Sequence, residues 1–136
     1  MKYSELVKFG QLAVSSEYFT FMPGMQVIEV NNECRSRLAY FNNYWNAYDG
    51  LAFMRYRDME NKIPDFSDPC TLGCLTFFVR KKFEDNRGQD GIATAFQIDG
   101  YWGVGSMEQN IFAAIVLPVY QTEIEALVVA LTKPLS

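Results

Sequence analysis

Apolar residues recur at helical spacing in three segments of the chain, and we expect a helix in each. The first helix covers residues 2–15, and its apolar side consists of Leu6, Val7, Phe9, Leu12 and Ala13. The second begins at Asp68-Pro69, where the carboxylate can cap free backbone N–H groups and proline suits the first helical position. It runs to about Phe83, and its apolar stripe consists of Leu72, Leu75, Val79 and Phe83, with Cys74 and Phe78 beside it. The third begins at the capping box Thr122-Glu123-Ile124-Glu125 and ends before Pro134.

Alternating or continuously apolar segments between these helices predict strands. We expect them near residues 25–30, 37–41, 51–57, 91–98, 101–104 and 111–120. Asp99-Gly100 favours a type I′ hairpin turn, and Met22-Pro23-Gly24-Met25 predicts another turn. The segment from Ile111 to Tyr120 is apolar on both faces, so we expect it to be central in its sheet or covered by a partner. A homo-oligomer is one arrangement that would cover it.

These elements predict a single small α+β domain, with an antiparallel sheet and about three helices in 136 residues. A division into two lobes is the alternative, with a small β lobe around residues 20–60 and a helix–hairpin–strand–helix part at residues 68–133. The sequence has no apolar leader with a cleavage site and no window of 18 uninterrupted apolar residues. We therefore expect a soluble protein that does not associate with membranes.

The absence of histidine is the most informative feature of the composition. Histidine is the commonest metal ligand and the usual proton shuttle near neutral pH, so we expect no enzyme, no metal site and no cofactor. The net charge of −4, from 16 acidic and 12 basic residues, disfavours general binding to duplex nucleic acid. Three cysteines, Cys34, Cys70 and Cys74, do not form a disulfide framework, and we interpret them as small buried hydrophobic residues.

Two charged clusters have structural interpretations. Arg80, Lys81 and Lys82 lie in the last turns of the second helix, where cations suit the negative end of the helix dipole. A phosphate site is the alternative interpretation of these residues. Asp65 and Asp68 resemble a carboxylate pair, but we assign them to the start of the second helix rather than to catalysis.

An aromatic cluster interrupted by asparagines is the main candidate binding site. It consists of Tyr40, Phe41, Tyr44, Trp45 and Tyr48, with Arg35, Arg37, Arg55 and Arg57 nearby. The rings could fill the core of a small β lobe, or they could form a surface that stacks a base or serves as a protein hot spot. In the second interpretation the binding residues are Tyr44, Trp45, Tyr48, Arg55 and Arg57. Trp45 is then partly exposed, whereas Trp102 is more nearly buried in its hairpin.

Several motifs resemble a group of uncharacterised small accessory proteins that tailed phages and prophages encode. The matching segments are Phe21-Met22-Pro23-Gly24-Met25, the stretch from Pro64 to Leu75 (PDFSDPCTLGCL) followed by Phe78-Val79-Arg80, a tryptophan-bearing hairpin, and the stretch from Thr122 to Leu131 (TEIEALVVAL). The resemblance covers residues 20–133, although residues 38–57 do not match its pattern. It implies an accessory phage gene expressed in the host cytoplasm, and it transfers no activity.

Two functional hypotheses from different classes follow. In the first, the chain is a non-enzymatic phage protein that acts in the host cell by binding a host protein or a small nucleotide ligand. Its effect would be to block a defence protein or to sequester a nucleotide signal. In the second, the chain is a structural or assembly protein of the phage particle. Such proteins usually have extended arms, and this sequence predicts none.

Overall fold

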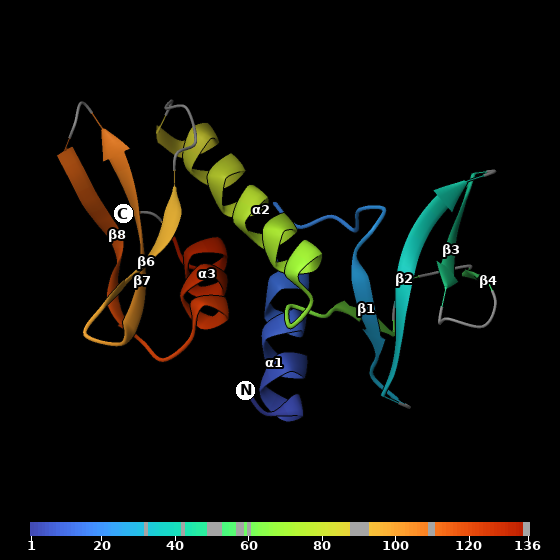
Figure 1. Ribbon diagram of the computed structural model, residues 1–136. Coiled ribbons are helices and arrows are strands. Elements are labelled where there is room, and N and C mark those ends of the chain that lie inside the picture. The colour runs from blue at the N-terminus through green and yellow to red at the C-terminus, as the bar shows by residue number, and fades with distance from the viewer. Residues whose placement is uncertain are drawn as a thin grey trace. The chain divides into compact units, whose positions relative to one another are not determined.

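The computed structural model describes residues 1–31, 33–41, 43–48, 53–56, 59, 61–87, 93–108 and 111–134. Three helices and two antiparallel sheets are formed by these residues, which confirms the predicted α+β class (Figure 1). The chain divides into two compact units. The first consists of residues 1–14 and 20–74, and the second consists of residues 15–19 and 75–136.

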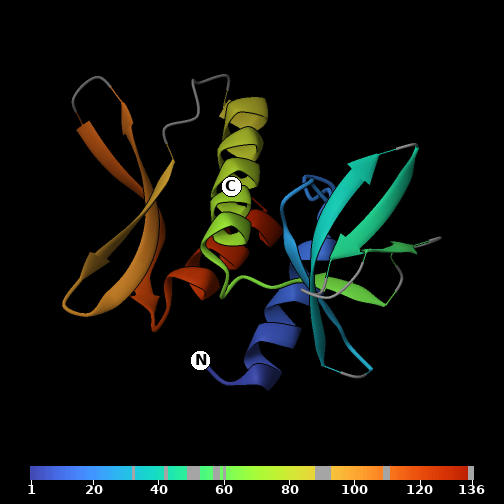
Figure 2. The same cartoon turned by 45° about the vertical axis from the view of Figure 1, so that its right-hand side comes forward.

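The first unit contains a five-stranded sheet with the strand order β4-β3-β2-β1-β5 (Figure 2). Its strands are β1 (Gln26–Glu29), β2 (Cys34–Phe41), β3 (Tyr44–Tyr48), β4 (Phe53–Tyr56) and β5 (Lys62–Pro64). The helix α1 (Tyr3–Val14) packs on β5, so closely that a Cβ atom at Gly10 would lie 3.0 Å from the Ile63 Cδ1 atom. The buried residues of this unit include Leu6, Phe9, Ala13, Met25, Val27, Ile28, Leu38, Ala47, Ile63 and Phe66.

The second unit contains a three-stranded sheet with the order β6-β7-β8, and helix α3 (Glu123–Thr132) packs against it (Figures 1 and 2). The strands are β6 (Thr94–Ile98), β7 (Tyr101–Glu108) and β8 (Ile111–Tyr120). Asp99 and Gly100 have φ angles of 53° and 85°, which confirms the expected hairpin turn. The buried residues here include Phe78, Val79, Phe83, Val104, Leu127, Val128 and Leu131.

Helix α2 (Pro69–Arg87) begins where the Asp68-Pro69 signal predicted, and its first residues belong to the first unit. It extends four residues beyond the expected end at Phe83. Leu75, Val79 and Phe83 are buried as predicted, and Leu72 is half-buried. The expectation was wrong for Leu12 in α1, which is 41% exposed because the helix turns this position away from β5.

Two strands lie where the sequence pattern predicted none. Strand β3 occupies residues 44–48, which lack a clear alternation, and the short strand β5 lies in the expected loop before α2. Strand β5 pairs with β1, which lies far from it in the sequence. Strand β3 pairs with β2 and β4, its neighbours in the sequence, so it was missed because its own side chains do not alternate clearly. The predicted strand at residues 51–57 is present as β4, and its flanking residues lie outside the described part of the chain.

Strand β8 follows the predicted boundaries. The sequence analysis expected it either at the centre of its sheet or covered by a partner. It pairs with β7 and lies at the edge of its sheet, so a central position is wrong. The strand turns large apolar side chains to the surface, with Leu117 67% and Val119 61% exposed. Cover by a partner stays a prediction.

The buried face of α2 makes a direct test of the core. Leu75 is fully buried, so Leu75→Ala should lower the free energy of unfolding by about 2–5 kcal/mol by leaving a cavity. Phe77→Ala on the same helix is the matched control, since Phe77 is 54% exposed. Equal losses for the two variants in urea denaturation would contradict the assigned helix face.

Candidate functional site

The predicted aromatic cluster lies on the β2–β3 hairpin. Tyr40 pairs with Trp45 and Phe41 pairs with Tyr44 in the strand register. Directly paired residues share a face of the sheet and successive residues alternate, so the two pairs lie on opposite faces. The Tyr40 and Trp45 rings meet edge to face, with their centroids 5.1 Å apart. Tyr40, Phe41 and Tyr44 are 52%, 45% and 46% exposed, which makes this end of the hairpin an aromatic surface.

The structure brings together some of the predicted binding residues and separates others. Tyr44 is exposed on one face of the hairpin, whereas Trp45 is half-buried on the other. Tyr48 and Arg55 belong to β3 and β4, but their side chains lie outside the described part of the structure, as does Arg57. Tyr40, which the sequence analysis placed in the cluster but not among the binding residues, is the most exposed of the cluster's rings whose side chains the structure describes. Trp45 is partly exposed as predicted, and Trp102 is half-buried as well, so the expected difference in burial between the two tryptophans stays a prediction.

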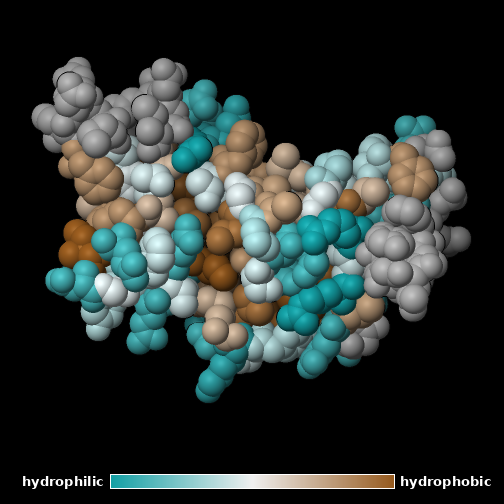
Figure 3. Space-filling view, in the orientation of Figure 1, coloured by the Kyte–Doolittle hydropathy of each residue, from teal (hydrophilic) through white to brown (hydrophobic). Residues whose placement is uncertain are grey.

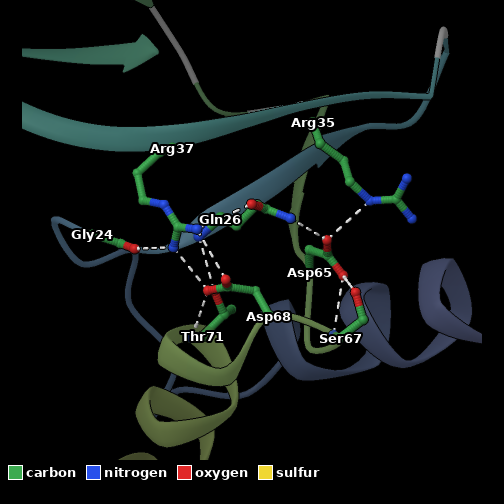
Figure 4. A network of polar contacts seen from close by, with 8 residues as sticks. All are labelled: Gly24, Gln26, Arg35, Arg37, Asp65, Ser67, Asp68 and Thr71. Atoms are coloured by element: carbon green, nitrogen blue, oxygen red, sulfur yellow. Dashed lines mark hydrogen bonds and ion pairs between the residues drawn. The ribbon is translucent and has the colours of Figure 1, made fainter. Parts of the chain in front are cut away.

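Arg37 does not face a ligand, because it is bound to the start of α2 (Figure 4). Its guanidinium donates to both carboxylate oxygens of Asp68, at 2.8 and 2.9 Å, in a bidentate arrangement. It also donates to the Gly24 carbonyl oxygen and to Gln26 Oε1. Asp68 accepts in addition from the Thr71 backbone N–H and hydroxyl, so it caps the helix as the sequence predicted.

Arg35 is held in a parallel way by Asp65, whose side chain is fully buried (Figure 4). One carboxylate oxygen accepts from Arg35 Nε at 3.0 Å and from Gln26 Nε2 at 2.7 Å. The other accepts from the Ser67 backbone N–H and hydroxyl. Asp65 is therefore part of an ion-paired network rather than of the helix cap to which we assigned it.

These contacts decide what the carboxylates can do chemically. The hydrogen bond from Arg37 is the largest cause that lowers the pKa of Asp68 to about 2, and the bonds from Thr71 add to it, although burial opposes them. A general acid or base needs a pKa near the working pH and a free approach for substrate. Asp68 has neither, and the oxygens of Asp65 are occupied by four donors.

Lys82 also has a role that the sequence did not predict. Its side chain is buried, and its Nζ atom donates to the carbonyl oxygens of Ala130 at 2.8 Å, Leu131 at 2.9 Å and Lys133. These are unsatisfied carbonyls at the C-terminal end of α3, where a cation also matches the helix dipole. The ammonium thus caps the C-terminal end of α3 rather than the end of α2, the helix to which Lys82 belongs. Arg80 likewise donates to the Ala93 carbonyl oxygen at 2.8 Å.

A cavity of about 500 Å³ lies beside Lys82, lined by residues 15–18 and 131–134. Burial lowers the pKa of the Lys82 amine, and Glu17 raises it. The three carbonyl acceptors also favour the charged form. The Lys82 ammonium already donates its hydrogen bonds to three carbonyl oxygens at the end of α3. It therefore has no donor left for a phosphate in this cavity.

A second exposed apolar surface lies on the three-stranded sheet, and the sequence analysis anticipated only the part of it that β8 contributes. Its exposed members are Ile98, Tyr101, Phe112, Leu117 and Val119. Figure 3 shows hydrophobic side chains that reach the surface over this sheet among polar ones. The signal was present in the two-faced apolar pattern of residues 111–120, which does not by itself reveal which face α3 covers.

The cysteines and acidic residues offer no further site. Cys34, Cys70 and Cys74 are free, and Cys70 is exposed rather than buried because it lies in the first turn of α2, away from its apolar stripe. Within the described ranges, no group of three or more cysteine, aspartate or glutamate side chains is placed to hold a metal ion. None of the described helices is long and apolar enough to cross a membrane.

No family model, curated protein or solved structure matches this chain.

Asp68 should make the stability of the protein depend on acid pH. Its folded pKa of about 2 lies below the ordinary value of 3.8, so its contribution is complete above that value and is lost as the pH falls toward 2. The difference corresponds to a contribution on the order of 2 kcal/mol. Asp68→Asn should remove this contribution and keep a cap, whereas Asp68→Ala should cost about 1 kcal/mol more. Urea denaturation measures the free energy of unfolding of wild type and Asp68→Asn at pH 7 and at pH 2.5. The difference between the two proteins should be smaller at pH 2.5, and an equal difference at both pH values would contradict the assignment.

Lys82→Met should lower the free energy of unfolding by about 1–3 kcal/mol, because buried carbonyl oxygens at the end of α3 lose their donor. Lys81→Met is the matched control, since the neighbouring Lys81 side chain is exposed. Chemical denaturation measures both values. Similar results for the two lysines would show that the buried hydrogen bonds contribute little.

Proposed function

We propose that the chain is a non-enzymatic binding protein that contacts a protein partner through the aromatic end of the β2–β3 hairpin. The observation that carries this proposal is the exposure of three aromatic rings, Tyr40, Phe41 and Tyr44, within one turn of chain. Tyrosine is enriched at the energetic centres of protein interfaces, because it buries a large area and keeps a hydroxyl for hydrogen bonding.

The arrangement of the rings favours a protein over a small nucleotide. A nucleotide site stacks the base on a ring and places cations at the phosphates. Here Tyr40 and Tyr44 lie on opposite faces of the hairpin, so they do not form one stacking platform. The nearby arginines Arg35 and Arg37 are bound to the carboxylates of Asp65 and Asp68. A hairpin end with rings on both faces is better suited to insertion between the side chains of a protein.

A binding role also agrees with the state of the acidic groups. The sequence contains no histidine, and Asp65 and Asp68 of the first unit are occupied by arginine, amide and hydroxyl donors. These residues stabilise the fold. Catalysis would need a free acid, base or nucleophile in a cleft, and neither aspartate meets that need.

The resemblance to accessory proteins of tailed phages supplies the biological setting of the proposal. In that setting the chain acts in the cytoplasm of the infected cell, and its partner is a host protein that takes part in defence. The aromatic hairpin falls within residues 38–57, which do not follow the pattern of the group. A recognition surface that differs from an otherwise shared framework fits a protein directed against a particular host target.

A photo-crosslinking experiment tests the proposed surface. The crosslinking amino acid p-benzoylphenylalanine replaces Phe41, which shares a face with Tyr44, or replaces Phe77 as an exposed control. Irradiation of infected cells should yield one protein adduct from position 41 that position 77 does not give. Adding Tyr44→Ala should reduce that adduct at least about tenfold, as for a hot-spot residue. The melting curve should stay nearly unchanged, because an exposed ring contributes little to stability.

The same adducts at both positions, or none at position 41, would contradict the proposal.

A nucleotide ligand is tested separately by titrating the tryptophan fluorescence with ATP and with cyclic dinucleotides. We expect no saturable change. A saturable change that Trp45→Phe removes would replace the protein partner with a nucleotide.

A further inference from the structure

The free edge of β8 lacks the features that usually prevent strands from pairing. Within the described residues β8 has one neighbour, β7, and the other edge of the strand is unpaired. Natural edge strands are commonly protected by charged side chains, by prolines or by covering segments. Residues 111–120 include no charged residue. A ten-residue, uncharged, apolar edge strand therefore calls for a partner.

The single proline of β8 does not protect this edge. A Cβ atom at Gly103 of β7 would lie 2.9 Å from the Pro118 nitrogen and 2.4 Å from the Val116 oxygen. The proline nitrogen thus approaches the strand with which β8 already pairs. The register shifts between β7 and β8 at the same place, which accommodates the missing N–H group. The opposite edge keeps its capacity to pair.

The outward side chains of β8 are spaced so that the strand complements itself. Phe112 and Ala114 pair with Met107 and Gly105 of β7, on the face opposite the buried Val104. Phe112, Leu117 and Val119 are among the exposed large hydrophobic residues, and Ala114 is exposed too. Positions 112 and 114 are as far from the midpoint between Ile115 and Val116 as positions 119 and 117. Antiparallel pairing of two copies about this midpoint sets Phe112 opposite Val119 and Ala114 opposite Leu117.

We propose that β8 pairs with β8 of a second copy of the chain, about a two-fold axis between Ile115 and Val116. Each large outward side chain then meets a smaller one, and no like charges face each other along the strands. An apolar groove of about 260 Å³ lies between this part of β8 and the end of α3, lined mostly by residues 115–120, Val129 and Ala130. The second strand would cover it. The exposed Lys133 at the groove keeps its ammonium group in water.

Sedimentation equilibrium over a range of concentrations measures the association. We expect a reversible species of twice 15.6 kDa. Leu117→Lys should raise the dissociation constant at least about tenfold, because a charge enters the apolar contact. Phe77→Lys is the matched control, since this residue of α2 is 54% exposed and lies outside the proposed contact, and it should leave the dissociation constant unchanged. Circular dichroism and melting curves confirm that both variants fold.

Mixing two variants tests the register. Ala114→Glu and Leu117→Lys should each weaken the dimer, because each sets a charge against an apolar residue. In the mixture the proposed register places Glu at position 114 of one copy opposite Lys at position 117 of the other, while the second contact keeps its native Ala114 and Leu117. The mixed dimer should therefore form at least about tenfold more tightly than either variant alone.

Hydrogen exchange distinguishes strand pairing from stacking of the exposed sheet faces. Strand pairing should slow amide exchange in residues 111–120 as the protein concentration rises. Any of three results would overturn the proposal: a wild-type monomer at all concentrations, which would leave the edge to a strand of another protein; a dimer in which exchange at β8 does not respond; or no recovery in the mixture.

Discussion

The ion pair between Arg37 and Asp68 connects the elements of the first unit. The Asp68 carboxylate accepts a hydrogen bond from the Thr71 N–H, which caps α2, and it also binds the guanidinium of Arg37 in β2. Arg37 in turn reaches the carbonyl oxygen of Gly24, at the turn before β1. A single carboxylate thus fixes the start of a helix, the middle of a strand and a turn relative to one another. The cost of partly burying its charge is offset by the hydrogen bonds that it accepts from Arg37 and Thr71.

The same network determines the character of the candidate binding surface. Arg35 and Arg37 lie in the strand that also carries Tyr40, so the sequence suggested a mixed aromatic and basic surface. Asp65 and Asp68 hold both arginines, and the surface at the end of the hairpin is left with its rings. The network holds the first half of the strand, and the second half carries the exposed side chains. Rigid aromatic side chains lose little entropy on binding, which favours recognition of a protein.

In the second unit, one helix packs on the three-stranded sheet. Helix α3 packs on one face, and its last carbonyl oxygens are satisfied from α2 by Lys82 rather than by its own sequence. The other face and the edge at β8 keep apolar side chains at the surface. Among the described residues, a unit with one covering helix thus leaves β8 at the edge of its sheet, and the proposed pairing of two copies would protect this edge.

The sequence by itself determined the features that depend on neighbouring residues. The Asp68-Pro69 start of α2, the Thr122 cap of α3 and the Asp99-Gly100 turn each rest on contacts within a few residues, and each was predicted correctly. Tertiary structure decided whatever depends on residues far apart in the chain. Strand β5 exists because it pairs with the distant strand β1, and Lys82 is buried because it donates to carbonyl oxygens some fifty residues later. Periodicity shows which side chains are apolar, but the topology of the sheet decides that those of β8 are left at an edge.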